Sequence, residues 1–144
     1  MKLTTTLYTI FLAISLTLAA CSPLASSNDL VGTTWQLVSY GPEGQQVLAV
    51  QGVSTWVTFD ADGRMSGTLG CNQFSGGYKI KGTTIKFGPI MSTEMACPEP
   101  QMSQETSAFR VLSGTVSYLV EGNNLIISAE SGDTELRLTR LLQQ

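Results

Sequence analysis

Apolar and polar residues alternate with a period of two along much of the chain after residue 30. Val57 and Phe59 lie on one face of such a run, and Trp56 lies on the opposite face. This period is that of a half-buried β-strand, and the following Asp62-Gly63 pair is typical of a hairpin turn. Similar short runs recur between turns rich in Gly and Asn, and they predict about eight strands. The expected strands lie at 30–40, 53–59, 64–69, 78–80, 84–87, 115–120, 125–128 and 134–142.

One segment has a helical period instead. Residues 100–113 carry Met102, Phe109 and Leu112 at helical spacing. A proline near the start and Gly114 just past the end are the expected punctuation of a helix. We expect this helix to pack its Phe109 face against the sheet.

The amount of apolar surface constrains the fold. Of the 144 residues, 42% are hydrophobic and 13% are charged. A single sheet with water on both faces could not bury so many apolar side chains, so the sheet must curl into a barrel or form two layers. We therefore predict a mainly β fold, a compact antiparallel barrel-like sheet of about eight short strands with one packed α-helix.

The first 29 residues have a different pattern, which indicates export. Lys2 precedes an apolar run at 7–18, and Leu18-Ala19-Ala20-Cys21 follows. This order resembles the lipobox of bacterial lipoproteins, and the resemblance implies cleavage before Cys21 and acylation of that cysteine. An uncleaved transmembrane helix over 3–20 is the alternative, because its 18 residues are near the lower limit for crossing a bilayer.

This interpretation divides the chain into three parts and places it in the cell. We expect a lipoprotein signal peptide at 1–20, a lipidated Cys21 with a short tether over 21–29, and one domain over 30–144. The polar residues 22–28 would reach about 23–25 Å when fully extended. The protein is then exported and lipid-anchored in the cell envelope. If the source is didermal, the resemblance to bacterial lipoproteins implies that Ser22, after the lipidated cysteine, leads to sorting to the outer membrane, on its periplasmic face.

Charge and composition exclude several classes of function. The formal net charge is −3, so there is no basic surface to bind nucleic acid by counterion release. The chain contains no histidine, which removes the commonest general base and metal ligand. We therefore expect no catalytic residues, no metal and no cofactor.

Three motifs carry a resemblance to a known family. Leu30-Val31-Gly32-Thr33-Thr34-Trp35 opens the domain, Gly70-Cys71-Asn72-Gln73-Phe74-Ser75-Gly76-Gly77-Tyr78 follows the second hairpin, and Ser92-Thr93-Glu94-Met95-Ala96-Cys97 precedes the helix. Together they resemble the META domain of HslJ-type heat-shock lipoproteins, over about residues 30–141. The resemblance implies a mostly antiparallel β domain with one helix in the bacterial envelope, linked in some members to heat or drug stress. It does not imply a settled biochemical activity.

Cys71 and Cys97 remain once Cys21 carries lipid. Two thiols in an oxidising compartment usually pair, so we expect a disulfide, worth about 3–4 kcal/mol in the chain-entropy model. Two reduced and packed thiols are the alternative. A redox pair is disfavoured because the spacing is not Cys-x-x-Cys and no His or Lys is adjacent.

The remaining candidates are contacts. Asn72 sits in a glycine-rich loop, where it would bond its own backbone or, alternatively, touch a ligand. Trp56 belongs either to a second core or to an exposed contact surface. With Phe74 and Tyr78, it could line a cavity.

The acidic residues around the helix start have a structural explanation. Glu94, Glu99 and Glu105 suit the positive end of the helix dipole, and we expect that role rather than a catalytic carboxylate pair.

These observations predict a non-enzymatic, stress-related envelope lipoprotein that acts as a monomer. It would bind the membrane through its lipid and another envelope component through its surface. A small-ligand-binding barrel and a protease-inhibitor-like module are the alternatives.

Overall fold

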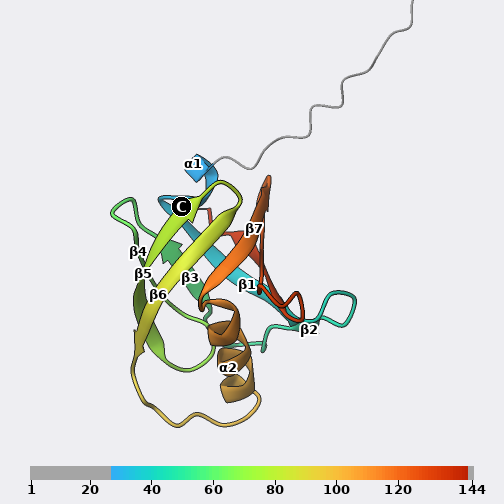
Figure 1. Ribbon diagram of the computed structural model, residues 1–144. Helices are drawn as coiled ribbons and strands as arrows, with labels where there is room; N and C mark the ends of the chain where they lie inside the picture. The colour runs from blue at the N-terminus through green and yellow to red at the C-terminus, as the bar shows by residue number, and fades with distance from the viewer. Residues whose placement is uncertain (1–26, 143–144) are drawn as a thin grey trace, which may run out of the picture.

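The computed structural model describes residues 27–142 (Figure 1). The signal peptide and the lipidation of Cys21 therefore lie outside the described residues. Among residues 27–142, no helix is long and apolar enough to cross a membrane.

Eight antiparallel strands close into a barrel. Each strand from β3 to β8 pairs with the next along the chain, and β1 pairs with both β3 and β9. The strands are β1 (Thr33–Gly41), β3 (Trp56–Phe59), β4 (Arg64–Thr68), β5 (Gln73–Lys81), β6 (Thr84–Ser92), β7 (Thr115–Glu121), β8 (Asn124–Ser128) and β9 (Glu135–Arg140). A two-residue strand, β2 (Val47–Leu48), pairs with β1 outside the barrel. The predicted mainly β, barrel-like fold is confirmed.

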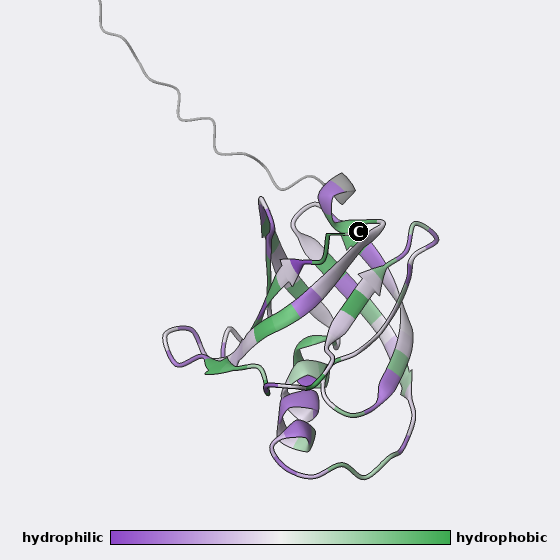
Figure 2. Ribbon diagram, turned by 180° about the vertical axis from the view of Figure 1, so that it is seen from behind, coloured by the Kyte–Doolittle hydropathy of each residue, from purple (hydrophilic) through white to green (hydrophobic). Residues whose placement is uncertain are grey.

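The barrel interior is filled by side chains. Alternate residues of each strand point inward, as the period of two predicts. Trp35, Phe59, Met65, Leu125 and Leu136 are all fully buried. Figure 2 shows the resulting alternation of hydrophobic and hydrophilic positions along the strands.

The two ends of the barrel are covered by different elements. The short helix α1 (Ser27–Leu30) lies at the end that also holds the β3–β4, β5–β6 and β7–β8 turns and the C-terminus (Figures 1 and 2). Its Leu30 is fully buried. The longer helix α2 (Gln101–Val111) lies at the opposite end, where it buries Ala108 and Val111.

The sequence predictions differ from this structure in several places. Strand β5 begins at Gln73 rather than at residue 78, and β6 continues to Ser92 rather than ending at residue 87. Residues 27–29, which we expected in the tether, belong to α1, and β1 begins only at Thr33. Strand β2 adds a ninth strand to the eight expected. The buried face of α2 contains Gln104 and Glu105, whereas Met102 on the expected face is only partly buried.

Gly67 of β4 has no room for a side chain, because the backbone of β3 lies directly against it. A Cβ atom there would lie 2.1 Å from the carbonyl oxygen of Trp56 and 2.9 Å from the Cα of Val57. Both atoms belong to the backbone of β3, so relief would require the strands to separate.

We therefore predict that Gly67→Ala lowers the free energy of unfolding by about 3 kcal/mol or more, measured by urea denaturation. Gly77→Ala is the matched control, because its added Cβ would meet only the Gly63 carbonyl oxygen, at 3.9 Å. We expect that control to stay within about 0.5 kcal/mol of the parent chain. Equal stabilities for the two variants would contradict the predicted clash.

Candidate functional site

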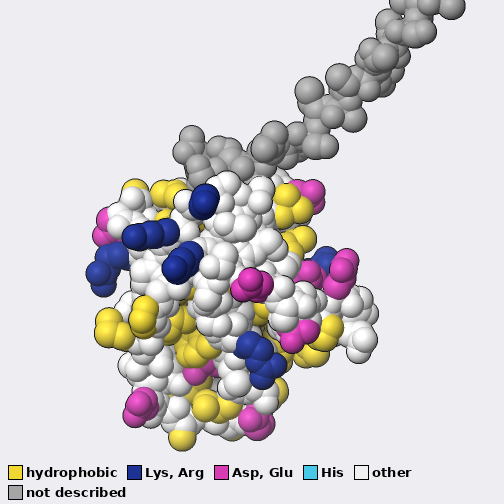
Figure 3. Space-filling view, in the orientation of Figure 1, with side chains coloured by type: hydrophobic (Ala, Val, Ile, Leu, Met, Phe, Trp, Pro, Cys, Tyr) yellow, Lys and Arg dark blue, Asp and Glu magenta, His cyan; other side chains and the backbone are white. Residues whose placement is uncertain are grey.

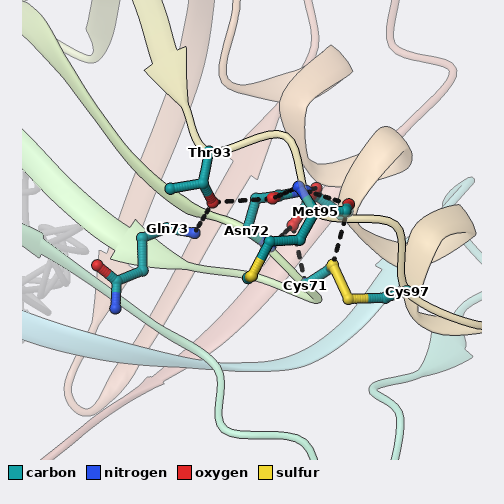
Figure 4. Close-up of a disulfide and its surroundings, with 7 residues drawn as sticks. Cys71, Asn72, Gln73, Thr93, Met95 and Cys97 are labelled. Carbon is teal, nitrogen blue, oxygen red and sulfur yellow. Dashed lines mark hydrogen bonds between the residues drawn. A yellow bond between two sulfur atoms is a disulfide. The ribbon is translucent and has the colours of Figure 1, made fainter.

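The predicted pairing of Cys71 with Cys97 is present in the structure. The two Cα atoms are 5.9 Å apart, and the disulfide closes a loop with a sequence separation of 26. It joins the turn after β4 to the segment that leads from β6 into α2 (Figure 4).

A buried carboxylate holds the same turn from the helix side. Glu105 Oε2 accepts hydrogen bonds from the backbone N–H groups of Cys71 (2.8 Å) and Asn72 (2.5 Å), and its Oε1 accepts one from Asn72 Nδ2 (2.7 Å). Glu105 is 4% exposed. A buried charge needs such donors, because burial without them costs several kcal/mol.

Asn72 connects this carboxylate to the β6 side of the corner. Its Oδ1 accepts hydrogen bonds from the Met95 N–H and the Thr93 hydroxyl, both at 2.8 Å. Figure 4 shows these side chains converging beside the disulfide. Asn72 was predicted to bond its own loop backbone, but it instead bridges two distant segments and α2.

The neighbouring helix residue, Gln104, makes a second buried connection. Its Nε2 donates to the Leu69 carbonyl oxygen, and its Oε1 accepts from the Val50 N–H, both at 2.7 Å. Gly70 lets α2 come this close, since a Cβ there would lie 2.6 Å from the Gln101 carbonyl oxygen.

The four predicted contact residues do not form a common exposed site. Asn72, Phe74 and Tyr78 are buried, and Trp56 is half-buried at the start of β3. Phe74 packs edge-on against Phe109, with ring centroids 5.3 Å apart. Tyr78 packs edge-on against the core ring of Phe59 at 5.2 Å.

The three glutamates assigned to the helix dipole occupy different positions. Only Glu99 caps the helix start, where its Oε2 accepts from the Ser103 N–H at 3.1 Å. Glu94 is exposed, and Glu105 lies inside the helix with its carboxylate bonded to the β4–β5 turn. The expected dipole role is thus wrong for Glu105.

Within residues 27–142, no group of three or more His, Cys, Asp or Glu side chains is arranged to hold a metal ion.

A surface that the sequence did not predict lies at the end of β6. The β6–β7 ladder stops at the Lys86–Thr115 pair, although β6 continues to Ser92. A groove of about 380 Å³ opens between this part of β6 and α2. It is lined by Phe87, Gly88, Pro89, Ile90, Phe109, Leu112, Ser113 and Gly114.

A second groove lies on the outer face of the same strand end. It measures about 400 Å³, and Met91, which is 67% exposed, lines it together with Gln73 and Thr93. We call Gly88–Thr93, with the grooves on its two sides, the β6 end. Figure 3 shows hydrophobic side chains gathered on the lower half of this face, over the region of β6 and α2.

The fold and the corner define a class of protein: a closed antiparallel meander barrel, filled by side chains and plugged at one end by a helix, with a disulfide joining the β4–β5 turn to the segment before that helix. The META domain family matches residues 28–141. The chain belongs to this family, as the resemblance predicted. No functionally curated protein matches the chain.

Solved structures share the fold at low sequence identity. The NMR structure of a protein from Burkholderia xenovorans has a TM-score of 0.67 and 22% identity, over 81% of this chain and 86% of that one. A second protein solved by NMR gives a TM-score of 0.63 and 20% identity, over 80% and 94%. The crystal structure of a DUF4847 family protein from Bacteroides vulgatus gives 0.60 and 15%, over 81% and 98%. These likenesses establish the fold alone.

We predict that Glu105→Gln lowers the free energy of unfolding by about 1–3 kcal/mol. The glutamine amide would point N–H donors either at the turn's own N–H groups or at Asn72 Nδ2. Urea denaturation measures the loss, and Glu94→Gln is the control because Glu94 is exposed. A Glu105→Gln variant as stable as the control would show that the carboxylate is dispensable.

Tyr78 gives the fold a predicted sensitivity to alkaline pH. Its hydroxyl donates to the Asp60 carbonyl oxygen at 2.7 Å. Burial, and then the Asp60 and Asp62 carboxylates, raise the pKa of Tyr78 above its ordinary value of 10.0. The stability that Tyr78 contributes is therefore fully present below pH 10 and is lost as the pH rises through the higher folded-state pKa.

We expect Tyr78→Phe to cost about 1 kcal/mol at neutral pH and to flatten the decline in stability above pH 10. Urea denaturation at a series of pH values compares the two slopes. The range from pH 7 to pH 9 serves as the internal control, because the two curves should run parallel there. Equal slopes above pH 10 would contradict the assignment.

Proposed function

We propose that this chain is a non-enzymatic, lipid-anchored and stress-related protein of the bacterial envelope, which binds an apolar segment of another envelope component at its β6 end. The β6 end is the observation that carries the binding step. Its parts are an exposed Met91 and an apolar groove on the other side of the strand.

The disulfide supports an oxidising location. Disulfides persist in exported proteins and are rare in the reducing cytosol. Together with the lipobox-like sequence that ends at Cys21, the Cys71–Cys97 bond favours an exported and anchored chain.

The buried carboxylates support a non-enzymatic role. Glu105 is occupied by three N–H donors from the β4–β5 turn. Glu135 forms an ion pair with Arg137 at 2.7 Å and also accepts from Gln46 Nε2. Both groups are engaged in holding the fold together, so neither is free to act as an acid or a base.

The β6 end suits an apolar partner segment. Methionine side chains adapt to irregular partners, and a groove lined by Ile90 and Phe109 offers an apolar surface that a partner could cover. Pro89 has no N–H to offer along the strand, which disfavours strand addition and favours side-chain insertion into the grooves. The filled interior, by contrast, argues against the alternative of a ligand in the barrel.

The test is photocrosslinking in living cells of a host that processes lipoproteins. A photoreactive amino acid replaces Met91 in one strain and Ser117, an exposed residue of β7, in another. We expect one dominant adduct from the Met91 position that depends on Cys21. The Ser117 position should give none.

Substitutions then test the surface itself. Met91→Glu should reduce the adduct formed from a probe at Ser92 by at least about tenfold, because a charge would have to be buried against an apolar partner. Leu119→Glu is the matched control, since Leu119 is an exposed apolar residue of β7 at 39% exposure. No Cys21-dependent adduct, or equal effects of both substitutions, would overturn the proposal.

A further inference from the structure

The lysines of the described residues all lie on one hairpin. Lys79 and Lys81 lie on β5 and Lys86 on β6, and all three are exposed. Lys79 pairs directly with Lys86 in the strand register. Like charges opposite each other destabilise a sheet, and the ion pair found within residues 27–142 joins Arg137 to Glu135 instead. Sheet stability therefore does not account for this lysine face.

Charge is divided unevenly along the barrel axis. The half with α1 has five cations against four carboxylates, and the half with α2 has two cations against seven carboxylates. The first set is Arg64, Lys79, Lys81, Lys86 and Arg140, with Asp29, Asp60, Asp62 and Glu121; the second is Arg110 and Arg137, with Glu43, Glu94, Glu99, Glu105, Glu130, Asp133 and Glu135. Figure 3 shows Lys and Arg side chains gathered on the upper part of the face, over β4 to β6. An anionic surface would attract the first end and repel the second.

The chain enters the barrel at this same end. Helix α1 begins at Ser27, beside the β5–β6 turn (Figure 1). If Cys21 carries lipid, the six steps from it to Ser27 span at most about 22 Å. Lys81 lies at the turn and Lys79 about 7 Å further along the strand. The anchor thus keeps the lysine face close to the headgroups.

A groove lies beside the lysines. It measures about 460 Å³ and opens where β5 and β6 shift register between Gly76 and Tyr78. The groove is lined by Asp62, Gly63, Gly77, Tyr78, Lys79, Lys86, Phe87 and Gly88. The lysines supply cationic groups, whereas Tyr78 and Phe87 are almost fully buried beneath the groove. The Asp62 carboxylate accepts from the Arg64 N–H at 3.1 Å, within its own turn.

We infer that the lysine face of the β5–β6 hairpin docks on anionic phospholipid headgroups of the membrane that holds the anchor. The inference rests on the proposed lipid anchor, and it adds an orientation. The hairpin lies down on the bilayer, while the acidic α2 end and the β6 end turn toward the aqueous side.

The experiment uses the lipidated full-length protein in vesicles that contain a phospholipid with a photoreactive group near its headgroup. One vesicle set contains 30% phosphatidylglycerol, and the other contains phosphatidylcholine alone. Adducts are mapped by mass spectrometry per vesicle-bound protein. We expect hairpin adducts in the anionic vesicles that fall about tenfold in phosphatidylcholine, in high salt, and in the triple variant Lys79→Gln, Lys81→Gln, Lys86→Gln. Arg110→Gln, at the opposite end, should leave them unchanged.

The outcomes separate the inference from the proposed function. A protein that does not sediment with either vesicle set refutes the anchor. A protein that sediments with both but gives equal hairpin adducts in both, or keeps them in the triple variant, overturns the docking surface alone. Circular dichroism of the triple variant checks its fold, which should be retained because the substitutions remove a pair of opposed like charges.

Discussion

The barrel can keep a dry interior only if the end beneath α2 is closed, and closure depends on the Glu105 carboxylate. The buried face of α2 carries Gln104 and Glu105 beside Ala108 and Val111, so apolar packing alone cannot seat this helix and its buried polar groups need partners. Three charge-assisted hydrogen bonds from Glu105 to the β4–β5 turn fix the position of the helix on the barrel end. They also satisfy two backbone N–H groups that otherwise would be buried without partners. Gly70 permits the close approach of α2. The Cys71–Cys97 bond keeps the β4–β5 turn tethered to the segment before α2 in the unfolded chain, which lowers the conformational entropy lost on folding.

Much of this architecture follows from local pattern. The period of two located most barrel strands, since alternate burial is what a closed sheet requires. It missed the first part of β5 and the last part of β6, where Gly76, Gly77, Gly88 and Pro89 interrupt the alternation. Strand β2 was missed because two exposed residues carry no period, and α1 was missed because four residues next to a polar tether look like more tether. The closure of β1 on β9 follows from the excess of apolar residues over what an open sheet could bury.

The candidate site was harder to predict because its decisive contacts are long-range. A carboxylate near a helix start is expected to interact with the helix dipole. Only the tertiary structure distinguishes Glu99, which accepts a hydrogen bond from the helix start, from Glu105, which is buried and bonds to the β4–β5 turn. One feature of the sequence did indicate the buried polar face of the helix. Counting back by helical steps from Val111 through Ala108 reaches Gln104 and Glu105, so two polar residues occupied the face that had to meet the core. Gly70 is consistent with the close approach of that helix face. The sequence alone, however, does not identify α2 as the segment that Gly70 contacts.

The buried network also determines the shape of the β6 end. Asn72, held by Glu105, in turn fixes Met95 and Thr93 through its carbonyl oxygen, and the Thr93 N–H donates to Gln73. These hydrogen bonds thus hold the end of β6 in place, although β7 no longer pairs with it. A surface held in this way loses little conformational entropy on binding, so a modest apolar contact suffices for specific recognition. The same network that closes the barrel therefore prepares the surface at its outer edge, and loosening Glu105 should weaken both together.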